Sequence, residues 1–273
     1  MMSFFEKDKR AQLVLLLYVI FILWWLLVHY FWSSNYFDLQ LFAATYGIVA
    51  LLGGYWGLKT SKRWGGDKSY MGKSILFFSL GLLAQEFGQL SYSYYIFFRH
   101  VDVPYPSIGD IGYFISIPLY IAGIVYLAQA SGVRLRLKNI LPVLQAILLP
   151  MVILLFSYVY FLRDYSIDMN NLKPLTIFLD FAYPLGQATY VSLALVTYLL
   201  VGKILGGVMR NRILLILFAL VIQYSADYMF LYQARNGGWF AGGLNDVLYL
   251  SAYFMMTISL LSLDGVIGKL KSA

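Results

Sequence analysis

Eight long apolar runs recur along the chain, and this feature restricts its fold more than any other. A helix needs about 20 predominantly apolar residues to cross the hydrocarbon core of a bilayer, and its backbone must satisfy its own hydrogen bonds there. The sequence therefore predicts an all-α polytopic membrane helix bundle, a single integral membrane domain over residues 1–273. The eight predicted transmembrane helices cover residues 11–32, 39–58, 71–98, 107–130, 140–162, 174–204, 213–232 and 244–263.

The composition agrees with a membrane protein and excludes several kinds of site. Only 12% of the residues are charged and the mean hydropathy is +0.72, whereas a soluble domain carries about 25% charged residues. The chain has no cysteine, which excludes disulfides, iron–sulfur clusters and thiol nucleophiles. It has only two histidines, which argues against a multi-histidine metal centre. The residue types therefore identify no cofactor and no metal.

The positive charges follow a membrane pattern rather than a nucleic-acid pattern. All but four of the 20 lysines and arginines lie in the two terminal segments and in alternate loops. Cytoplasmic loops of membrane proteins are enriched in Lys and Arg. The pattern therefore predicts that both termini are cytoplasmic and that the chain is a multi-pass protein of the plasma (cytoplasmic) membrane. The four basic residues on the predicted outer side are Arg99, Arg163, Lys173 and Arg235.

An Asp-x-x-Tyr motif occurs near the predicted outer ends of three helices. The three pairs are Asp110 with Tyr113, Asp180 with Tyr183, and Asp246 with Tyr249. Residues three apart share a helical face, so each hydroxyl can approach the carboxylate or a shared partner. A charge near the bilayer centre costs about 2.5–3.5 kcal/mol on insertion scales, and such residues are usually functional. Glu86 is such a residue, close to mid-membrane, and Asp227 is a further acid near the outer end of its helix.

Acids without basic partners and surrounded by tyrosines suit a cation, whether a proton, a metal ion or an organic ammonium. The predicted ligand site therefore gathers acids, amides and tyrosines of similar depth in the outer half of the bundle. Its residues are Glu86, Gln89, Asp110, Tyr113, Asp180, Tyr183, Gln187, Gln223, Asp227, Tyr228, Asp246 and Tyr249.

A structural interpretation of the same residues stands beside the functional one. An acid in the first turn of a helix stabilises it by about 0.3–1 kcal/mol, and Ser107 followed by Asp110 resembles a capping box. Capping can thus account for Asp110 and Asp246, but it does not explain Asp180 or Asp227. A polar network that joins helices contributes about 0.6 kcal/mol per bond. Both interpretations stay open at this point.

The region from about residue 80 to 263 resembles the polytopic sensory regions that precede GGDEF/EAL and some histidine kinase domains in bacteria. The resemblance rests on a Pro-Ser-x-x-Asp-x-x-Tyr motif at Pro106 and on Tyr-Pro-Leu at Tyr183, with Gln187 in place of the usual acid. It rests also on Ala-Asp at Asp227 and on Asp-x-x-Tyr at Asp246. It implies a membrane sensing module, and because no such output domain follows residue 263, the output domain is expected to be missing or to be supplied by a partner.

These features favour one function and leave two alternatives. The first is a membrane-embedded sensor or receptor module that binds a small, cationic or aromatic ligand from the outer side. The alternative is a proton- or cation-coupled small-molecule transporter. An intramembrane enzyme is least favoured, because the chain has no His-Glu-x-x-His motif, and no catalytic residue is assigned. The expected partners are the lipid bilayer, the ligand, and a cytoplasmic output protein or a second copy of the chain, but not nucleic acid.

Overall fold

The computed structural model describes residues 8–31, 36–132, 148, 151–153, 155, 156, 159, 174–204, 209–235 and 237–272, and its regular structure over these residues is helical throughout. The longer elements are α2 (Lys9–Tyr30), α3 (Tyr36–Thr45), α4 (Ile48–Arg63), α5 (Tyr70–Ser93), α6 (Gly109–Ala130), α8 (Pro174–Ile204), α9 (Arg210–Arg235) and α10 (Leu244–Ser272). A short 3-10 turn, η1 (Gly66–Lys68), precedes α5, and a π-helical turn, η2 (Tyr94–Phe98), extends it.

Five segments of the described chain are long and apolar enough to cross a membrane: Lys9–Tyr30, Tyr36–Arg63, Gly109–Ala130, Arg210–Gln233 and Leu244–Ile267. The prediction of an all-helical membrane bundle is therefore confirmed at this level. The predicted spans 71–98 and 174–204 are also helical, although they are not among these five. The predicted span 140–162 lies mostly outside the described residues.

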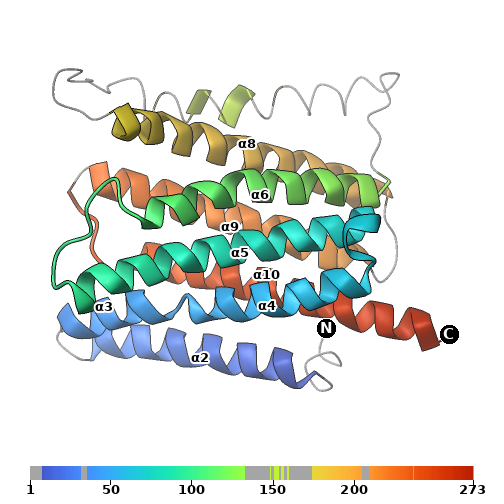
Figure 1. Ribbon diagram of the computed structural model, residues 1–273, viewed down its shortest axis with the longest axis horizontal. Coiled ribbons are helices and arrows are strands. Elements are labelled where there is room, and N and C mark those ends of the chain that lie inside the picture. Colours follow the sequence, from blue (N-terminus) through green and yellow to red (C-terminus); the bar gives the residue numbers. More distant parts are fainter. Residues whose placement is uncertain are drawn as a thin grey trace.

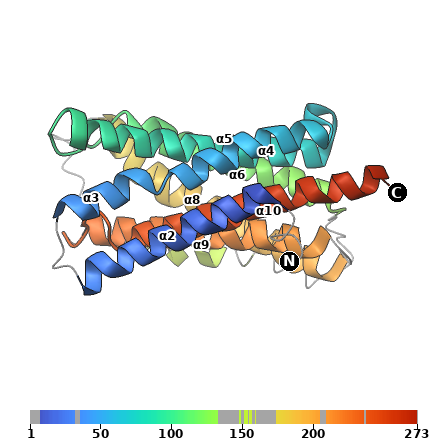
Figure 2. The same cartoon turned by 90° about the horizontal axis from the view of Figure 1, so that it is seen from below.

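Six of the helices pack side by side in a closed ring. Around the ring, α4 contacts α5, α5 contacts α6, α6 contacts α8, α8 contacts α9, α9 contacts α10, and α10 returns to α4. Figures 1 and 2 show α4, α5 and α6 as one layer lying over α9 and α10. We call the end of the bundle where α2 begins and α10 ends the proximal end, and the opposite end, with the α5–α6 and α9–α10 connections, the distal end.

Helix α2 lies outside this ring and packs mainly against α10. Near the distal end α2 is held by Trp25, whose Nε1 donates to the carbonyl of Gly242 at 2.8 Å. At the proximal end the carboxylate of Asp264 on α10 accepts from Arg10 of α2 at 2.9 Å and from Arg63 of α4 at 2.6 Å. These contacts hold α2 against α10 near both ends of α10.

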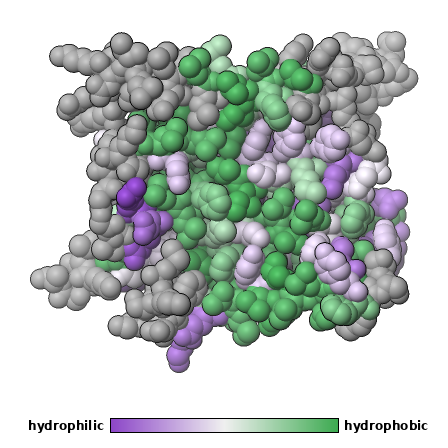
Figure 3. All heavy atoms as spheres, turned by 180° about the vertical axis from the view of Figure 1, so that it is seen from behind, coloured by the Kyte–Doolittle hydropathy of each residue, from purple (hydrophilic) through white to green (hydrophobic). Residues whose placement is uncertain are grey.

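The surface has the polarity of a membrane protein. Figure 3 shows apolar residues over the middle of one face, with the most hydrophilic residues mainly toward its left and right edges, where the helices end. The exposed apolar side chains include a continuous set on α2, namely Leu13, Leu15, Leu16, Val19, Ile20, Leu23, Leu26 and Leu27. Contact of such an apolar surface with lipid is favourable, whereas its contact with water is unfavourable.

The buried core differs between the two ends of the bundle. Toward the distal end it is rich in buried acids, amides and tyrosines. Toward the proximal end it is apolar apart from Ser and Thr hydroxyls and the carboxylate of Asp264, which is paired with Arg10 and Arg63. The apolar part is formed by Ile75, Phe78, Ile124, Leu127, Ile213, Leu217, Leu220 and Leu260, each of which is almost fully buried.

One predicted span is not a continuous helix. The span 39–58 is interrupted at Tyr46 and Gly47, which separate α3 from α4. Irregular backbone at membrane depth occurs where it is buried in protein or lines a polar cavity. Here the side chains of α5 replace the missing helical bonds, because Gln89 Nε2 donates to the carbonyl of Ala43 at 2.6 Å and Ser93 Oγ donates to that of Ala44 at 3.2 Å. By contrast, α6 and α8 continue through Pro118 and Pro184.

Candidate functional site

Tyrosine hydroxyls join neighbouring helices all around the distal half of the ring. Each of five junctions between adjacent helices carries a hydrogen bond from a tyrosine to an acid or an amide. We call this set the acid–tyrosine network. Its bonds run from Tyr46 to Asp246 (3.3 Å), Tyr249 to Asp227 (2.8 Å), Tyr190 to Asp227 (2.7 Å), Tyr183 to Asp110 (2.7 Å), and Tyr113 to Gln89.

Asp227 on α9 is the centre of the network. Its Oδ2 accepts from Tyr190 of α8, and its Oδ1 accepts from Tyr249 of α10. Gln223, one turn earlier on α9, approaches the same carboxyl at 3.5 Å. The residue is only 8% exposed, so the two hydroxyls replace the water that would otherwise solvate it. Asp227 thus connects three consecutive helices of the ring.

Asp246 combines two roles at the start of α10. Its Oδ2 accepts the backbone N–H of Gly242 at 2.7 Å, and its Oδ1 accepts from Tyr46 at the break between α3 and α4. The first contact satisfies a backbone donor ahead of the helix, as a cap does. The second joins α10 to the neighbouring α3–α4 segment. Asp246 therefore acts both as a cap and as a link between helices, which are the two parts of the structural interpretation.

Asp110 has the same double role at the start of α6. Its Oδ2 accepts the N–H of Ser107 at 2.7 Å, and the Ser107 hydroxyl accepts the N–H of Gly109 at 3.1 Å. This is the predicted capping box, which is confirmed. The other carboxylate oxygen of Asp110 accepts from Tyr183 of α8.

Two buried glutamines link α5 to the rest of the network. Gln85 Oε1 accepts from Tyr253 of α10 at 3.0 Å, and its Nε2 donates to Ser116 of α6 at 2.8 Å. Gln89 accepts from Tyr113 through Oε1 and donates to the carbonyl of Ala43. The Oε1 atoms of Gln85 and Gln89 therefore each accept a hydrogen bond from a tyrosine.

Some predicted site residues lie apart from this network. Asp180 is half-buried and accepts from Tyr105 of the α5–α6 connection at 2.7 Å. Tyr228 packs its ring against Phe156, at 5.7 Å between centroids, and Tyr224, at 6.1 Å. Gln187 is buried on α8 and forms no hydrogen bond to the network within the described residues. The prediction grouped residues by their expected depth in the membrane, and this depth does not show on which face of its helix a residue lies.

Glu86 is buried in the network region but is not bonded to it. Its side chain is 6% exposed, and Oε2 has no hydrogen-bond partner among the described residues. Within the same part of the chain, no Lys, Arg or His lies within salt-bridge distance of the carboxyls of Glu86, Asp110, Asp227 or Asp246. No group of three or more His, Asp and Glu side chains suited to a metal ion is found there either.

The site residues predicted from the sequence did not include Tyr46, Tyr120 or Tyr190. Tyr190 and Tyr120 lie seven residues after Tyr183 and Tyr113 on their helices, and positions seven apart share a helical face. This spacing was a usable signal. Tyr120 is almost fully buried and its hydroxyl has no partner in the described chain. Tyr46 had no such signal, because its position depends on the helix break.

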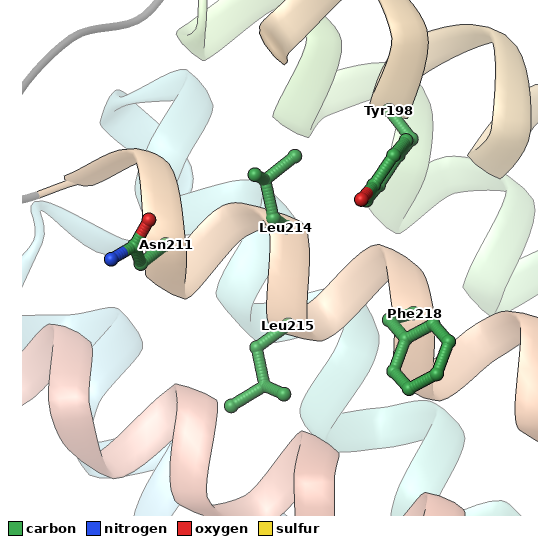
Figure 4. A pocket seen from close by; sticks show the side chains of 5 residues that line it. All are labelled: Tyr198, Asn211, Leu214, Leu215 and Phe218. Carbon is green, nitrogen blue, oxygen red and sulfur yellow. The ribbon is translucent and has the colours of Figure 1, made fainter. Parts of the chain in front are cut away.

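A surface depression of about 220 Å³ lies between α8 and α9, away from the network. Figure 4 shows its lining side chains, which are Tyr198, Asn211, Leu214, Leu215 and Phe218. It is shallow and mainly apolar and contains no acid. We therefore do not assign the candidate site to it.

The three Asp-x-x-Tyr motifs act between helices rather than within one. In each motif the carboxylate accepts from a tyrosine of another segment, and the hydroxyl donates to an acid or amide on another helix. The sequence predicted that each hydroxyl can approach its own carboxylate or a shared partner, whereas in the structure the two groups of each motif bind different partners. Comparison of the chain with protein-family models, curated proteins and solved structures finds no match.

Proposed function

We propose that this protein is a membrane-embedded sensor or receptor module that binds a small organic cation in the acid–tyrosine network. In this proposal the chain crosses the plasma membrane eight times, with both termini in the cytoplasm. The distal end then faces outward and the ligand enters there. The topology rests on the uneven distribution of Lys and Arg among the loops.

A single observation carries the proposal: buried carboxyls gather in the core, and no basic residue of the described chain pairs with them. Asp227 and Asp246 are 8% and 6% exposed, and their hydrogen-bond partners among the described residues are hydroxyl, amide and backbone groups. An ionised carboxylate in such surroundings is costly unless a positive charge compensates for it. A bound cation or a proton supplies that charge.

The tyrosines around these acids favour an organic ammonium over a metal ion. The rings of Tyr249 and Tyr253 stack at 6.3 Å between centroids, and those of Tyr46 and Tyr253 at 6.0 Å. Aromatic faces attract ammonium groups by about 0.5–2 kcal/mol each. A ligand that takes over a carboxylate must release a tyrosine hydroxyl from it, and this release loosens the junction between two helices.

Signalling from such a site requires an output. The resemblance to the sensory regions ahead of GGDEF/EAL and histidine kinase domains supports a role in transmitting ligand binding to the cytoplasm. The output in this proposal belongs to a separate cytoplasmic protein or to a second copy of the chain. Helix α10 is suited to carry the change, because it bears Asp246 near its start and extends to Ser272.

The proposal is tested by thermal unfolding of the purified protein with a set of quaternary ammonium compounds, primary amines and their neutral isosteres. Ligand at 100 times its Kd stabilises a protein by about 2.7 kcal/mol. We expect cations, but not their neutral isosteres, to raise the melting temperature, and Asp227→Asn to abolish the rise. Asp102→Asn is the matched control, since Asp102 is an exposed residue of the α5–α6 connection.

Two results would contradict the proposal. One is an equal response of the protein to cations and neutral isosteres, which would indicate apolar partitioning. The other is the absence of any response in wild-type protein while Asp227→Asn merely unfolds at lower temperature. The network would then serve only to hold the helices together.

Proton- or cation-coupled transport is the second candidate, and the break between α3 and α4 favours it. Transporters commonly place their sites at interrupted helices. Reconstitution in liposomes distinguishes the two functions, because transport predicts flux of the cation, whereas sensing predicts saturable binding without flux.

A further inference from the structure

The carboxyl of Glu86 lies directly against the helix break. A Cβ built on Gly47 would be 2.1 Å from Glu86 Oε2 and 3.0 Å from Gln89 Cγ, so the oxygen touches the Gly47 backbone. A side chain at position 47 would therefore have to displace the Glu86 carboxyl. The contact also places a buried, unpartnered carboxyl at the beginning of α4.

The beginning of α4 has unsatisfied donors of its own. Its N-cap residue, Gly47, supplies no side-chain cap. The N–H of Gly47 has no partner in the described chain, and the carbonyl of Ala43, its acceptor in a continuous helix, is held by Gln89. Helix N-termini expose N–H groups and favour negative charge. An acceptor without a donor therefore lies beside a donor without an acceptor, yet the two are not bonded.

We propose that Glu86 is a proton-binding site, neutral in the arrangement shown, and that release of its proton makes the carboxylate the cap of α4. In this step the O–H bond of the carboxylic acid breaks and the proton passes to water at the distal end. The carboxylate then accepts the N–H of Gly47. Because the carboxyl now faces the Gly47 Cα, forming this bond requires α3 and α4 to shift at the break.

The surroundings of Glu86 fit a proton better than a larger cation. A metal ion needs several oxygen ligands, but the oxygens of Gln85 and Gln89 already accept from Tyr253 and Tyr113. The titratable groups of α3, α6, α10 and the helix break in the distal half are acids and phenols, and they include Asp38, Tyr46, Asp110, Tyr113, Asp246 and Tyr253. The bases Arg99 and His100 at this end are exposed in the α5–α6 connection.

The test combines infrared spectroscopy with thermal unfolding of the full chain in lipid nanodiscs. Both are measured from about pH 5 to about pH 9, because this range covers the pKa values documented for buried carboxyls in proteins. Wild-type protein should show the C=O band of protonated carboxylic acids, and Glu86→Gln should lose the part of this band that Glu86 contributes. The unfolding constant should rise with pH, and each native-state proton contributes up to a tenfold rise per pH unit. Glu86→Gln, which cannot ionise at this position, should lose the contribution of one proton from this slope, whereas Asp102→Asn should keep the full slope.

A second variant keeps the test decisive if Glu86→Gln does not fold. Gly47→Ala retains the acid but forces its carboxyl away from the break, so it should shift the midpoint of the pH response, and the exposed Gly238→Ala should not. An unchanged band and slope in Glu86→Gln, or an unshifted midpoint in Gly47→Ala, would overturn the proposal. The proton site does not depend on the proposed amine site. Loss of the amine response in Asp227→Asn with an intact pH slope separates the two.

Discussion

At the scale of single residues, the site is built from shared acceptors. Asp227 receives two tyrosines from different helices, and its burial leaves no water to replace either of them. When one hydroxyl is removed, the other still satisfies part of the carboxyl. When both are removed, a buried acceptor is left with only the distant Gln223 amide, and the desolvation penalty then appears in full.

We therefore predict that Tyr190→Phe and Tyr249→Phe are not additive. Each single substitution should destabilise the protein by about 0.6–1.5 kcal/mol. The double variant should lose at least about 0.5 kcal/mol more than the sum of the single losses. Denaturant-induced unfolding in detergent measures all three, with Tyr30→Phe, whose side chain is 74% exposed, as the control. Strictly additive losses would show that the two bonds are independent.

The sequence predicted which residues are polar and at what depth, but not which ones meet. Asp227 was identified from its position in an apolar helix, yet its partners are 37 and 22 residues away along the chain. Pairing of this kind depends on the order and rotation of the helices in the ring, which hydrophobic periodicity does not give. Local contacts were predictable because they do not depend on the arrangement of the helices. The capping box at Ser107 and Asp110, which are three residues apart, is an example.

At the scale of helices, close approach of α5 and α6 holds one side of the ring. Gly112 of α6 faces the backbone of α5, where a Cβ would be 2.3 Å from the carbonyl oxygen of Ala84 and 2.9 Å from the N of Gly88. Backbone atoms cannot move aside as a flexible side chain does. The spacing of these two helices therefore fixes the reach of Tyr113 to Gln89.

Gly112→Ala should accordingly push α5 and α6 apart. We expect a loss of about 1–3 kcal/mol in unfolding free energy, the usual cost of overpacking, together with a reduced response to any ligand of the network. Gly238→Ala is the matched control, because nothing lies within 4 Å of a Cβ at that position. Equal stability of the two variants would mean that the α5–α6 contact adjusts without cost.

The helix break shows where prediction at this scale failed. Residues 39–58 are apolar enough to be predicted as one helix, and Gly47 alone is no signal for a break, since glycine is common in membrane helices. The break forms because α5 supplies Gln89 and Ser93 to the freed carbonyls. That compensation comes from another helix and is not visible in the local sequence.

At the scale of the whole molecule, the proposed topology assigns the two ends of the bundle to opposite sides of the membrane. Asp67 is exposed in η1 at the proximal end, and Asp102 is exposed in the α5–α6 connection at the distal end. The chain has no native cysteine, so a single introduced thiol reports only its own position.

In intact cells, a membrane-impermeant maleimide should label Asp102→Cys and should not label Asp67→Cys. Both variants should react after the cells are lysed, because both positions are exposed. Labelling of Asp67→Cys alone would reverse the orientation and would place the acid–tyrosine network toward the cytoplasm.

The apolar proximal core also determines how membrane voltage acts on the network. A transmembrane voltage falls mainly across the least polar part of a protein, which among the described residues is the layer formed by residues such as Phe78, Leu127 and Leu217. A charge that crosses the whole membrane exchanges about 2.3 kcal/mol per 100 mV. A cation that enters from the distal end and stops at Asp227 has not crossed that layer, so its occupancy should depend only weakly on voltage, while the layer itself insulates the two faces from each other.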